Sequence, residues 1–532
     1  MLRKIISLFI IGSLSLLAQS LPLDFNLASG KNKIAKISAT TPASNTIEQV
    51  LVDDNGTIWL ATSRGLSKST DNGANWTNYY QSDDFGTRAV SKVGYHNGAI
   101  WAGLWYNEEG IGGEAVAVGG GLRYSTDDGN TWIEIPQPVD DPNDDKITYG
   151  INVLDALPVT VPQQNLVYDI DFTSEAVWIA TFAGGLRKST DMGQTWQRVV
   201  LPPDYLDEIS PDDTLDFDLS PVAGELGFEE NYNHRVFSIL VVSDSLMYVG
   251  TSGGINKSTD GGVSWRKFNH QNQDEPISGN FIVELGFDES SNTVWAATWK
   301  AVDLAEYWAV SSSSDGGETW QTYLPDSRAH DFSFKYAYSG ANKTDSEILI
   351  ASEGGAFRSS NGGNTWIANP TPIDSETGVA LPSTQYRAVE ANRLSDLSTD
   401  IWLGTLDGLA KINESPNAFW SGEWTVYIAA QELASDVESY AFPNPFSPDE
   451  ERVTILYSTG GKDADVTIRI FDFGMNLVRT VIQNAPRIGS GEQQDIWDGR
   501  DENGRIVPNG VYFYRVDVGS NEPIYGKIMV LM

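Results

Sequence analysis

The chain has 532 residues, with 72 acidic against 35 basic side chains, a formal net charge of −37 and no cysteine. This charge argues against nucleic acid as a partner, because phosphate binding needs a basic surface. The lack of cysteine excludes disulfides, thiolate metal sites and a cysteine nucleophile, and the length predicts at least two domains.

Residues 1–20 are expected to form an export signal. Arg3 and Lys4 precede an apolar run over 5–17, and Ala18-Gln-Ser20 fits a small-x-small cleavage site. The run is too short to span a bilayer, and no later run is long enough, so we expect no transmembrane span. We predict a secreted or cell-surface protein in which 21–46 is a lead-in; an N-terminal membrane anchor is the alternative.

An eight-residue pattern, Ser-x-Asp-x-Gly-x-x-Trp, recurs six times between residues 69 and 366. Its carboxylate can accept hydrogen bonds from turn amides, its Gly can adopt positive φ, and its Trp can cover the gap between neighbouring sheets. We therefore expect structural hairpin turns, and not catalytic or calcium-binding loops, at Asp71, Asp127, Asp191, Asp260, Asp315 and Asn361, the last with an amide in place of the acid.

Each copy lies inside a unit of four short strands, A to D, joined by turns such as Asp54-Asn-Gly56. Seven units are counted, at about 47–80, 87–135, 165–202, 233–268, 278–324, 330–369 and 385–428; the seventh lacks the octapeptide. The pattern predicts an all-β fold with a seven-bladed β-propeller over 47–430. A six-bladed ring, or an extra strand from 33–39 that completes one blade, are the alternatives.

The sequence pattern changes at about Ser439. From there to residue 532, short segments of alternating apolar and polar residues, such as 453–457 and 466–471, are separated by Asn-Gly turns. About seven such strands predict a small β-sandwich.

The octapeptide resembles the Asp-box, or BNR, repeat of sialidases, sortilin-type receptors, xyloglucanases and photosystem assembly factors, over 47–428. This resemblance implies the propeller but no single chemistry, because these families share only the hairpin. The segments Phe442-Pro-Asn-Pro-Phe446, Trp497-Asp-Gly499 and Asn509-Gly-Val-Tyr512 resemble the Ig-like domain of flagellar hook-capping proteins and the C-terminal sorting domains of type IX secretion cargo. The sorting interpretation implies contact with a secretion machinery; a passive Ig-like spacer is the alternative.

The sequence shows no catalytic constellation. A sialidase would carry an Arg-Ile-Pro motif before the first repeat, and none is present before Ser69. The four histidines are isolated, which gives no support to a zinc site. Gly250-Thr-Ser-Gly-Gly254 fits a Gly-x-Ser-x-Gly pattern by letter, but it is predicted to be a B–C turn with no helix after it.

The topology places the octapeptides and the A–B turns on one face of the ring, and the B–C and D–A connections on the other. Every long insertion is expected on the latter face, and long loops that share a face usually carry function. Clustered acids in the D–A inserts at 136–164 and 203–232 could hold calcium. The candidate ligand-binding residues lie in the B–C inserts of units 2 and 5: Trp105, Tyr106, Glu108, Glu109, Trp299, Asp303, Glu306 and Trp308.

Aromatic rings beside carboxylates suit sugars or a protein partner. We therefore predict an exported binding or scaffold module for a polysaccharide or a cell-surface protein, with no catalytic residue, no metal ligand and no cofactor assigned. A carboxylate-dependent glycoside hydrolase or lyase on the same face is the first alternative, and an envelope assembly factor is the second.

Overall fold

The computed structural model describes residues 37–110, 113–220, 231–381, 383–429, 439–448, 452–459, 462–487, 492–519, 521 and 523–531. The expected export signal and residues 21–36 of the lead-in lie outside these ranges, as does the junction at 430–438. None of the described helices is long and apolar enough to cross a membrane.

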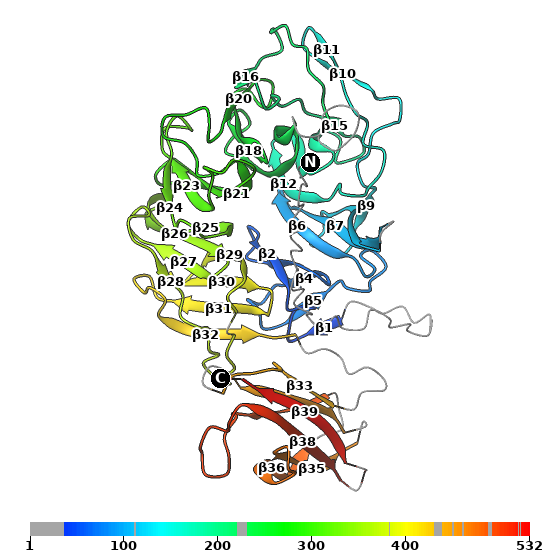
Figure 1. Ribbon diagram of the computed structural model, residues 1–532, viewed down its shortest axis with the longest axis vertical. Coiled ribbons are helices and arrows are strands. Elements are labelled where there is room, and N and C mark those ends of the chain that lie inside the picture. Colours follow the sequence, from blue (N-terminus) through cyan, green and yellow to red (C-terminus); the bar gives the residue numbers. More distant parts are fainter. Residues whose placement is uncertain are drawn as a thin grey trace, which may run out of the picture.

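Within the described residues, seven antiparallel sheets follow one another along the chain, each built from four consecutive strands. The first strands of neighbouring sheets lie side by side, and the first strand of sheet 7 returns to that of sheet 1, so the sheets form a closed β-propeller (Figure 1). The strands of sheets 1–4 are β2 (Ile47–Val52), β3 (Ile58–Thr62), β4 (Gly65–Ser69) and β5 (Trp76–Asn78); β6 (Ala89–His96), β7 (Ala99–Glu109), β8 (Ala115–Ser125) and β9 (Ile133–Ile135); β12 (Val167–Thr173), β13 (Ala176–Thr181), β14 (Gly185–Ser189) and β15 (Gln197–Arg198); β17 (Val236–Val241), β18 (Met247–Thr251), β19 (Gly254–Ser258) and β20 (Trp265–Phe268). The strands of sheets 5–7 are β21 (Phe281–Asp288), β22 (Thr293–Trp299), β23 (Ala309–Ser313) and β24 (Gln321–Tyr323); β25 (Ala329–Ser339), β26 (Asn342–Ser352), β27 (Gly355–Ser359) and β28 (Ile367–Ala368); β29 (Tyr386–Arg393), β30 (Thr399–Thr405), β31 (Leu409–Glu414) and β32 (Gly422–Tyr427).

The lead-in adds a strand without completing a blade. β1 (Ile37–Ala39) pairs with β5 as a fifth strand on the outer edge of sheet 1, and β16 (Glu208–Ile209) does the same for sheet 4. The long connection between sheets 2 and 3 forms a separate hairpin, β10 (Lys146–Tyr149) with β11 (Asn152–Asp155). Because all seven sheets have their own four strands, the six-bladed alternative is wrong for the described chain.

Residues 439–531 form two further antiparallel sheets around one apolar core that contains Trp497. The three-stranded sheet has the order β33 (Ser439–Phe442), β34 (Val453–Ser458), β37 (Glu492–Trp497). The four-stranded sheet has the order β36 (Leu477–Arg487), β35 (Ala464–Phe471), β38 (Gly510–Val518), β39 (Ile524–Val530).

The repeated octapeptide forms the turn between the third and fourth strands of sheets 1–6. In sheet 2, Ser125 Oγ donates to Asp127 Oδ1 at 2.8 Å and accepts the amide of Gly129 at 2.8 Å, while Asp127 Oδ1 also accepts the amide of Thr131 at 2.8 Å. Asn361 keeps this arrangement because its Oδ1 accepts the amide of Thr365 at 2.9 Å. We call the face that carries these turns the box face, and the opposite face the loop face.

The turn glycine and tryptophan contact the preceding sheet. A Cβ on Gly129 would lie 2.4 Å from Tyr79 Oη and 3.0 Å from the ring of Trp59 in sheet 1, and Gly129 has φ +73°. Trp132 meets Trp59 edge-on, with ring centroids 6.3 Å apart. Glycine is therefore required twice here, once by the backbone and once by the neighbouring rings.

Sheet 7 lacks the octapeptide but retains an aromatic contact to the preceding sheet. Trp420, in its last connection, packs with the apolar core of sheet 6, and its Nε1 donates to Ile367 O at 3.2 Å. Arg358 of sheet 6 donates to Ala418 O at 3.1 Å and pairs with the buried Glu414 at 2.8 Å. An ion pair and a tryptophan thus replace the acidic turn.

The long insertions do not all lie on the loop face, so that expectation is wrong. β25 and β26 form a hairpin of two 11-residue strands that extends the box face of sheet 6. Tyr336 in this hairpin accepts the amide of Glu289 at 3.2 Å, and Lys343 pairs with Glu289 at 2.7 Å. The sequence alternates over 332–338, but residues 342–347 are all polar, so the pattern does not show that both strands extend beyond the ring.

The inner strands carry a second repeated feature, a β-bulge near the start of each first strand. The side chain that follows the bulge can cap the open edge of the next inner strand. Asp169 accepts the amide of Ile239 at 2.9 Å, and Asp331 accepts the amide of Val389 at 2.9 Å. These bonds satisfy edge amides that no strand pairs with.

One lysine faces several acids around these inner strands. Lys92 Nζ lies 2.6 Å from Glu284 and 3.3 Å from Asp169. Burial raises the pKa of Asp171 to about 7 and that of Glu390 to about 8. Burial also raises the pKa of Glu284 and Asp331, and Lys92 opposes both shifts. The strands β2, β17 and β29 place Gln49, Ser238 and Ala388 at the position after the bulge, so this position carries no charge in them.

We predict that Gly129→Ala destabilises the propeller more than Gly98→Ala does. Both glycines have positive φ, but nothing lies within 4 Å of a Cβ on Gly98. Backbone strain is common to both variants, so the clash with sheet 1 should add about 1–3 kcal/mol for Gly129→Ala alone. Urea unfolding measures the difference, and equal losses would contradict the contact between sheets.

We predict that stability falls as the pH rises from about 6.5 to about 8. Below about 6.5 the buried His234 and His330 act in the opposite direction, because burial lowers their pKa. Acids with a raised pKa stabilise the fold fully below the unfolded value of about 4, and this contribution is lost as the pH passes the folded pKa of about 7 to 8. The thermal midpoint should therefore decline on the alkaline side, and Glu390→Gln should reduce this decline. Exposed Glu109→Gln is the control. A midpoint that is independent of pH over this range would refute the prediction.

Candidate functional site

The candidates in sheet 2 lie on an extension of a hairpin. β7 and β8 pair as far as Glu109 and Ala115, so the expected loop is a continuation of the two strands. Trp105 and Tyr106 are half-buried, and Glu108 and Glu109 are exposed. Glu108 accepts Tyr106 Oη at 3.1 Å and Gln163 Nε2 at 3.0 Å.

The two tryptophans of the sheet 5 insert contact an arginine. The guanidinium of Arg328 lies 5.8 Å from the centroid of Trp299 and 4.5 Å from that of Trp308. Trp299 Nε1 donates to Ala329 O at 2.9 Å, and Arg328 pairs with Glu353 at 3.4 Å. Both rings are half-buried, and they contact Arg328 and Ala329 at the start of sheet 6. They therefore help to hold sheet 6 in place.

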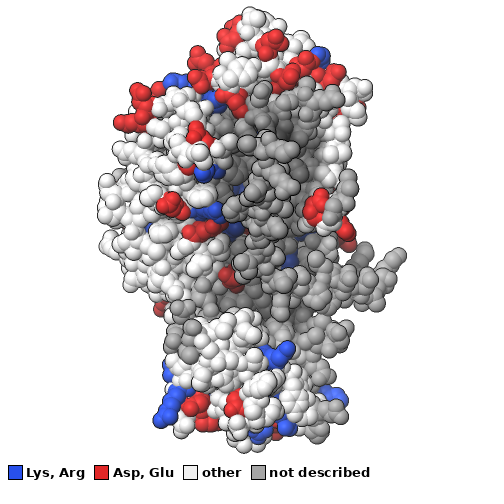
Figure 2. Space-filling view, in the orientation of Figure 1, with Lys and Arg blue, Asp and Glu red and all other residues white. Residues whose placement is uncertain are grey.

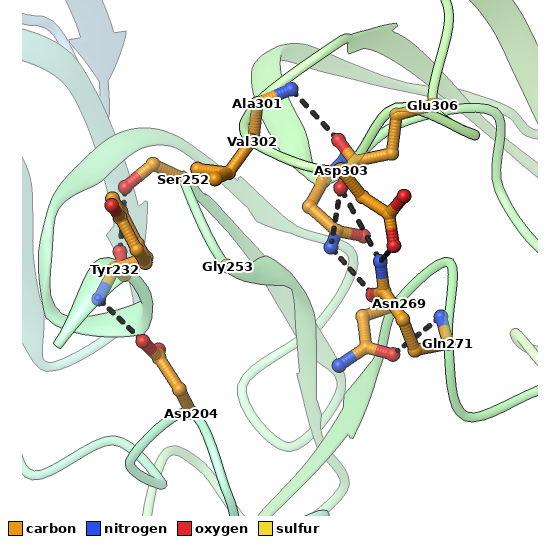
Figure 3. Close-up of a pocket in the computed structure, with 11 residues that line it drawn as sticks. Asp204, Tyr232, Ser252, Gly253, Asn269, Gln271, Ala301, Val302, Asp303 and Glu306 are labelled. Atoms are coloured by element: carbon orange, nitrogen blue, oxygen red, sulfur yellow. Dashed lines mark hydrogen bonds between the residues drawn. The ribbon is translucent and has the colours of Figure 1, made fainter. Parts of the chain in front are cut away.

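A pocket of about 330 Å³ opens on the loop face between sheets 4 and 5 (Figure 3). It brings together the turn after β18, the connection from β20 to β21, the insert after β22, and the residues around the short helix Tyr232–His234. Of the eight sequence candidates, Asp303 and Glu306 line it, and the other six do not. Its lining residues are Asp204, Tyr232, Ser252, Gly253, Asn269, Gln271, Asn280, Ala301, Val302, Asp303 and Glu306.

Glu306 holds this pocket together. Its side chain is only 4% exposed. Its Oε2 accepts the amides of Asn280 at 3.0 Å and Ala301 at 2.7 Å, and its Oε1 accepts Asn280 Nδ2 at 3.2 Å and Gln271 Nε2 at 3.3 Å. One carboxylate thus joins two separate connections. Its four hydrogen bonds offset the cost of removing the acid from water.

Asp204 has a similar role on the opposite wall. Its two oxygens accept the amides of Tyr232 at 2.9 Å and Asn233 at 2.8 Å. Burial raises the pKa of Asp204, and these backbone amides oppose the shift. Asp204 therefore fixes the helix that places the ring of Tyr232 in the pocket.

Asp303 differs because it is exposed. Its Oδ1 accepts the amide of Ala305 at 2.9 Å, and its Oδ2 accepts Gln271 Nε2 at 3.3 Å. The backbone bond from Ala305 lowers the pKa of Asp303, so its carboxylate is ionised at neutral pH. Asp303 therefore presents acceptor oxygens to whatever enters the pocket.

Ser252, the serine of the Gly-x-Ser-x-Gly match, lies in the turn between β18 and β19. Its Oγ donates to Tyr232 O at 2.7 Å, and the described lining of the pocket includes no histidine that could act as its base. Nucleophilic catalysis needs such a base within hydrogen-bond reach. The structure gives Ser252 a positioning contact only.

Sequence reasoning missed the amide side chains of the pocket, Asn269, Gln271 and Asn280. Their signal was a run of five polar residues, 269–273, that directly follows the fourth strand of sheet 4 on the loop face. The connection from β20 to β21, residues 269–280, is shorter than the inserts at 136–164 and 203–232, so attention to the longest inserts alone does not find it.

Acidic residues gather on the end of the propeller near β10, β11 and β16 (Figures 1 and 2). Among the described residues, no group of three or more His, Cys, Asp or Glu is arranged to hold a metal ion. Asp140 in this region instead pairs with Arg187 at 2.8 Å and also with Arg198. Calcium binding by these inserts stays an untested prediction.

The comparisons with known proteins concern the propeller. The chain is 25% identical over 296 residues to the xyloglucanase Xgh74A of Acetivibrio thermocellus, a match that spans 53% of this chain and 28% of the relative. The chain thus spans less than a third of the length of this curated relative. No protein-family model matches the chain.

Two solved structures resemble the chain at low sequence identity. An ancestral GH74 enzyme superposes with a TM-score of 0.50 at 13% identity, over 92% of this chain and 63% of that chain. PorZ, a surface component of the type-IX secretion system of Porphyromonas gingivalis, gives a TM-score of 0.39 at 13% identity, over 91% and 65% of the two chains. At such identity the first likeness shows a related β-propeller fold and nothing about activity.

We predict that Glu306→Gln destabilises the pocket, whereas Glu108→Gln does not. Each oxygen of Glu306 accepts two hydrogen bonds, and glutamine replaces one of these oxygens with an NH₂ group. Two donors then lose their acceptor, at a cost of about 1–3 kcal/mol each. Amide hydrogen exchange should accelerate in residues 280 and 300–306. Unchanged exchange in Glu306→Gln would show that this carboxylate does not hold the two connections.

Proposed function

We propose that this protein is an exported propeller whose loop face binds a polysaccharide through the pocket between sheets 4 and 5. The observation that carries the proposal is the lining of this pocket. Side-chain amides, the exposed carboxylate of Asp303, the ring of Tyr232 and the exposed Val302 surround a cavity of about 330 Å³. Polar groups with fixed positions beside an aromatic ring suit a sugar, which offers hydroxyls at its rim and C–H groups on its faces.

The bonding of the acids supports binding over hydrolysis. Glycoside hydrolysis by two carboxyls needs a protonated acid and a free carboxylate. The pKa of Asp303 is lowered, and the oxygens of Glu306 and Asp204 already accept four and two protein donors. Asp303 and Glu306 therefore lack the environment of a general acid. Burial raises the pKa of Asp204, but both of its oxygens are engaged by the backbone amides of Tyr232 and Asn233.

A glycoside hydrolase stays the second candidate because of the match to a xyloglucanase. In that case the catalytic acids lie elsewhere on the loop face, for example at the exposed Glu108 and Glu109 of the sheet 2 hairpin. Trp105 and Tyr106 beside them would then supply a sugar platform.

We further propose that residues 439–531 form an Ig-like sorting or anchoring domain that contacts a secretion machinery. Two antiparallel sheets around a shared core support the Ig-like assignment. Together with the sequence of residues 1–20, this proposal places the protein outside the cell or on its surface.

The decisive experiment uses the chain from residue 21 onward on a panel of immobilised plant and algal polysaccharides. We expect retention without release of reducing sugar. Val302→Arg should abolish retention, because position 302 lines the pocket and is 63% exposed, so the long side chain fills the cavity without disturbing a core.

Leu304→Arg is the matched control, since position 304 lies in the same insert, is 92% exposed and does not line the pocket. Reducing-sugar release that Glu108→Gln abolishes would establish the hydrolase. No retention on any polysaccharide would overturn the proposal in favour of a protein partner.

A further inference from the structure

Asn269 presents to the pocket a donor that no described protein group uses. The side chain is 9% exposed, and its Oδ1 accepts the amides of Gln271 and Asn272, both at 2.9 Å. These two donors fix which end of the carboxamide is the oxygen. The Nδ2 atom has no hydrogen-bond partner among the described residues, and it is directed toward the side of the pocket where Asp204 lies (Figure 3).

A ligand that displaces water from this donor must supply an acceptor in place of the water. A ligand that covers the nitrogen without an acceptor leaves a polar group unpaired, which is costly. The pocket borders Asn269, so a ligand atom can reach Nδ2. The ligand must therefore offer an oxygen lone pair to this nitrogen.

The opposite requirement comes from Asp303. Its ionised, exposed carboxylate also lines the pocket, and it can only accept hydrogen bonds. A ligand that lies between Asn269 and Asp303 must offer an acceptor to the first and a donor to the second. A carboxylate has acceptors only and an ammonium group has donors only, whereas a hydroxyl has both.

We infer that the pocket selects a neutral, hydroxyl-bearing sugar unit and rejects acidic sugars, with Asn269 and Asp303 as the residues that determine this specificity. The inference rests on the proposed glycan-binding function and adds to it the class of sugar. No Lys, Arg or His is among the described residues that line the pocket. Lys300 and His270 are close enough to lower the pKa of Asp303 but do not line the pocket, so a uronate in the cavity would meet the Asp303 carboxylate without a cationic side chain beside it. The ring of Tyr232 forms one side of the pocket, and the guanidinium of Arg235 lies 4.6 Å from the centroid of this ring.

The test uses pairs of oligosaccharides that differ only at C6. The hexamers of β-1,4-glucose and β-1,4-mannose are neutral, and the hexamers of β-1,4-glucuronate and β-1,4-mannuronate are their acidic counterparts. Calorimetry with the chain from residue 21 onward should show that at least one neutral hexamer binds about tenfold or more tightly than its acidic counterpart, the difference expected from one charged hydrogen bond.

Two conservative variants test the two residues. Asn269→Asp keeps the oxygen that holds Gln271 and Asn272 but removes the donor, so neutral binding should fall about tenfold or more. Asp303→Asn removes the charge, so the preference for the neutral hexamer should shrink and acidic binding should rise. Asp326→Asn, an exposed acid in the connection after β24, is the control and should change neither affinity.

Each outcome decides the inference separately from the proposed function. Equal or tighter binding of the acidic hexamers overturns the inference and leaves polysaccharide binding intact. Unchanged neutral binding in both variants overturns the assignment of Asn269 and Asp303. Failure of both neutral hexamers to bind also overturns it, and retention on the polysaccharide panel then shows whether the proposed function survives.

Discussion

The structure depends on contacts between neighbouring sheets, and above all on the bulky side chain, in most cases an aromatic ring, that one sheet offers to the octapeptide turn of the next. Each sheet is too small to bury its own faces, so the apolar area that stabilises it is supplied by its neighbours. The turn glycine is the most constrained position, because in each octapeptide a Cβ there would lie less than 3 Å from a side chain of the preceding sheet. This single requirement explains why the octapeptide recurs with so little variation.

The ring closes by the same contact, without exchange of a strand. Sheet 7 takes all four strands from residues 386–427, and Trp76 of sheet 1 packs against Trp402 and Tyr427. Lys411 Nζ also donates to Asn72 O at 3.0 Å. The seam therefore resembles the other junctions that an octapeptide turn makes, and β1 of the lead-in pairs on the outer edge of sheet 1.

The two faces of the ring have different roles because of this packing. The box face carries the turns that lock sheet to sheet, so its acids are committed to backbone amides. The loop face is less constrained, and the pocket arises where a short connection, a B–C insert and a helix meet. Even there most acids hold loops in place, which leaves Asp303 and Asn269 as the groups with bonding capacity for a ligand.

The sequence by itself determined the number and order of the sheets and the position of the turns, because hairpins depend on residues that are close in the chain. The Asn-Gly turns, the octapeptides and the two-residue alternation are all local signals. They also indicated the strands of residues 439–531. The overlong β25–β26 hairpin was missed since alternation marks a strand but does not say where it leaves the ring.

Only the tertiary structure decided which of the candidate residues share a site. Asp303 and Glu306 meet Asp204, Asn269 and Tyr232 in one pocket, whereas Trp105 and Glu108 lie on another hairpin and Trp299 and Trp308 enclose Arg328. These groupings join residues from up to three sheets, and no local pattern encodes them. Whether a carboxylate serves a loop or a ligand depends on the amides that reach it, and those amides are brought to it by the closure of the ring.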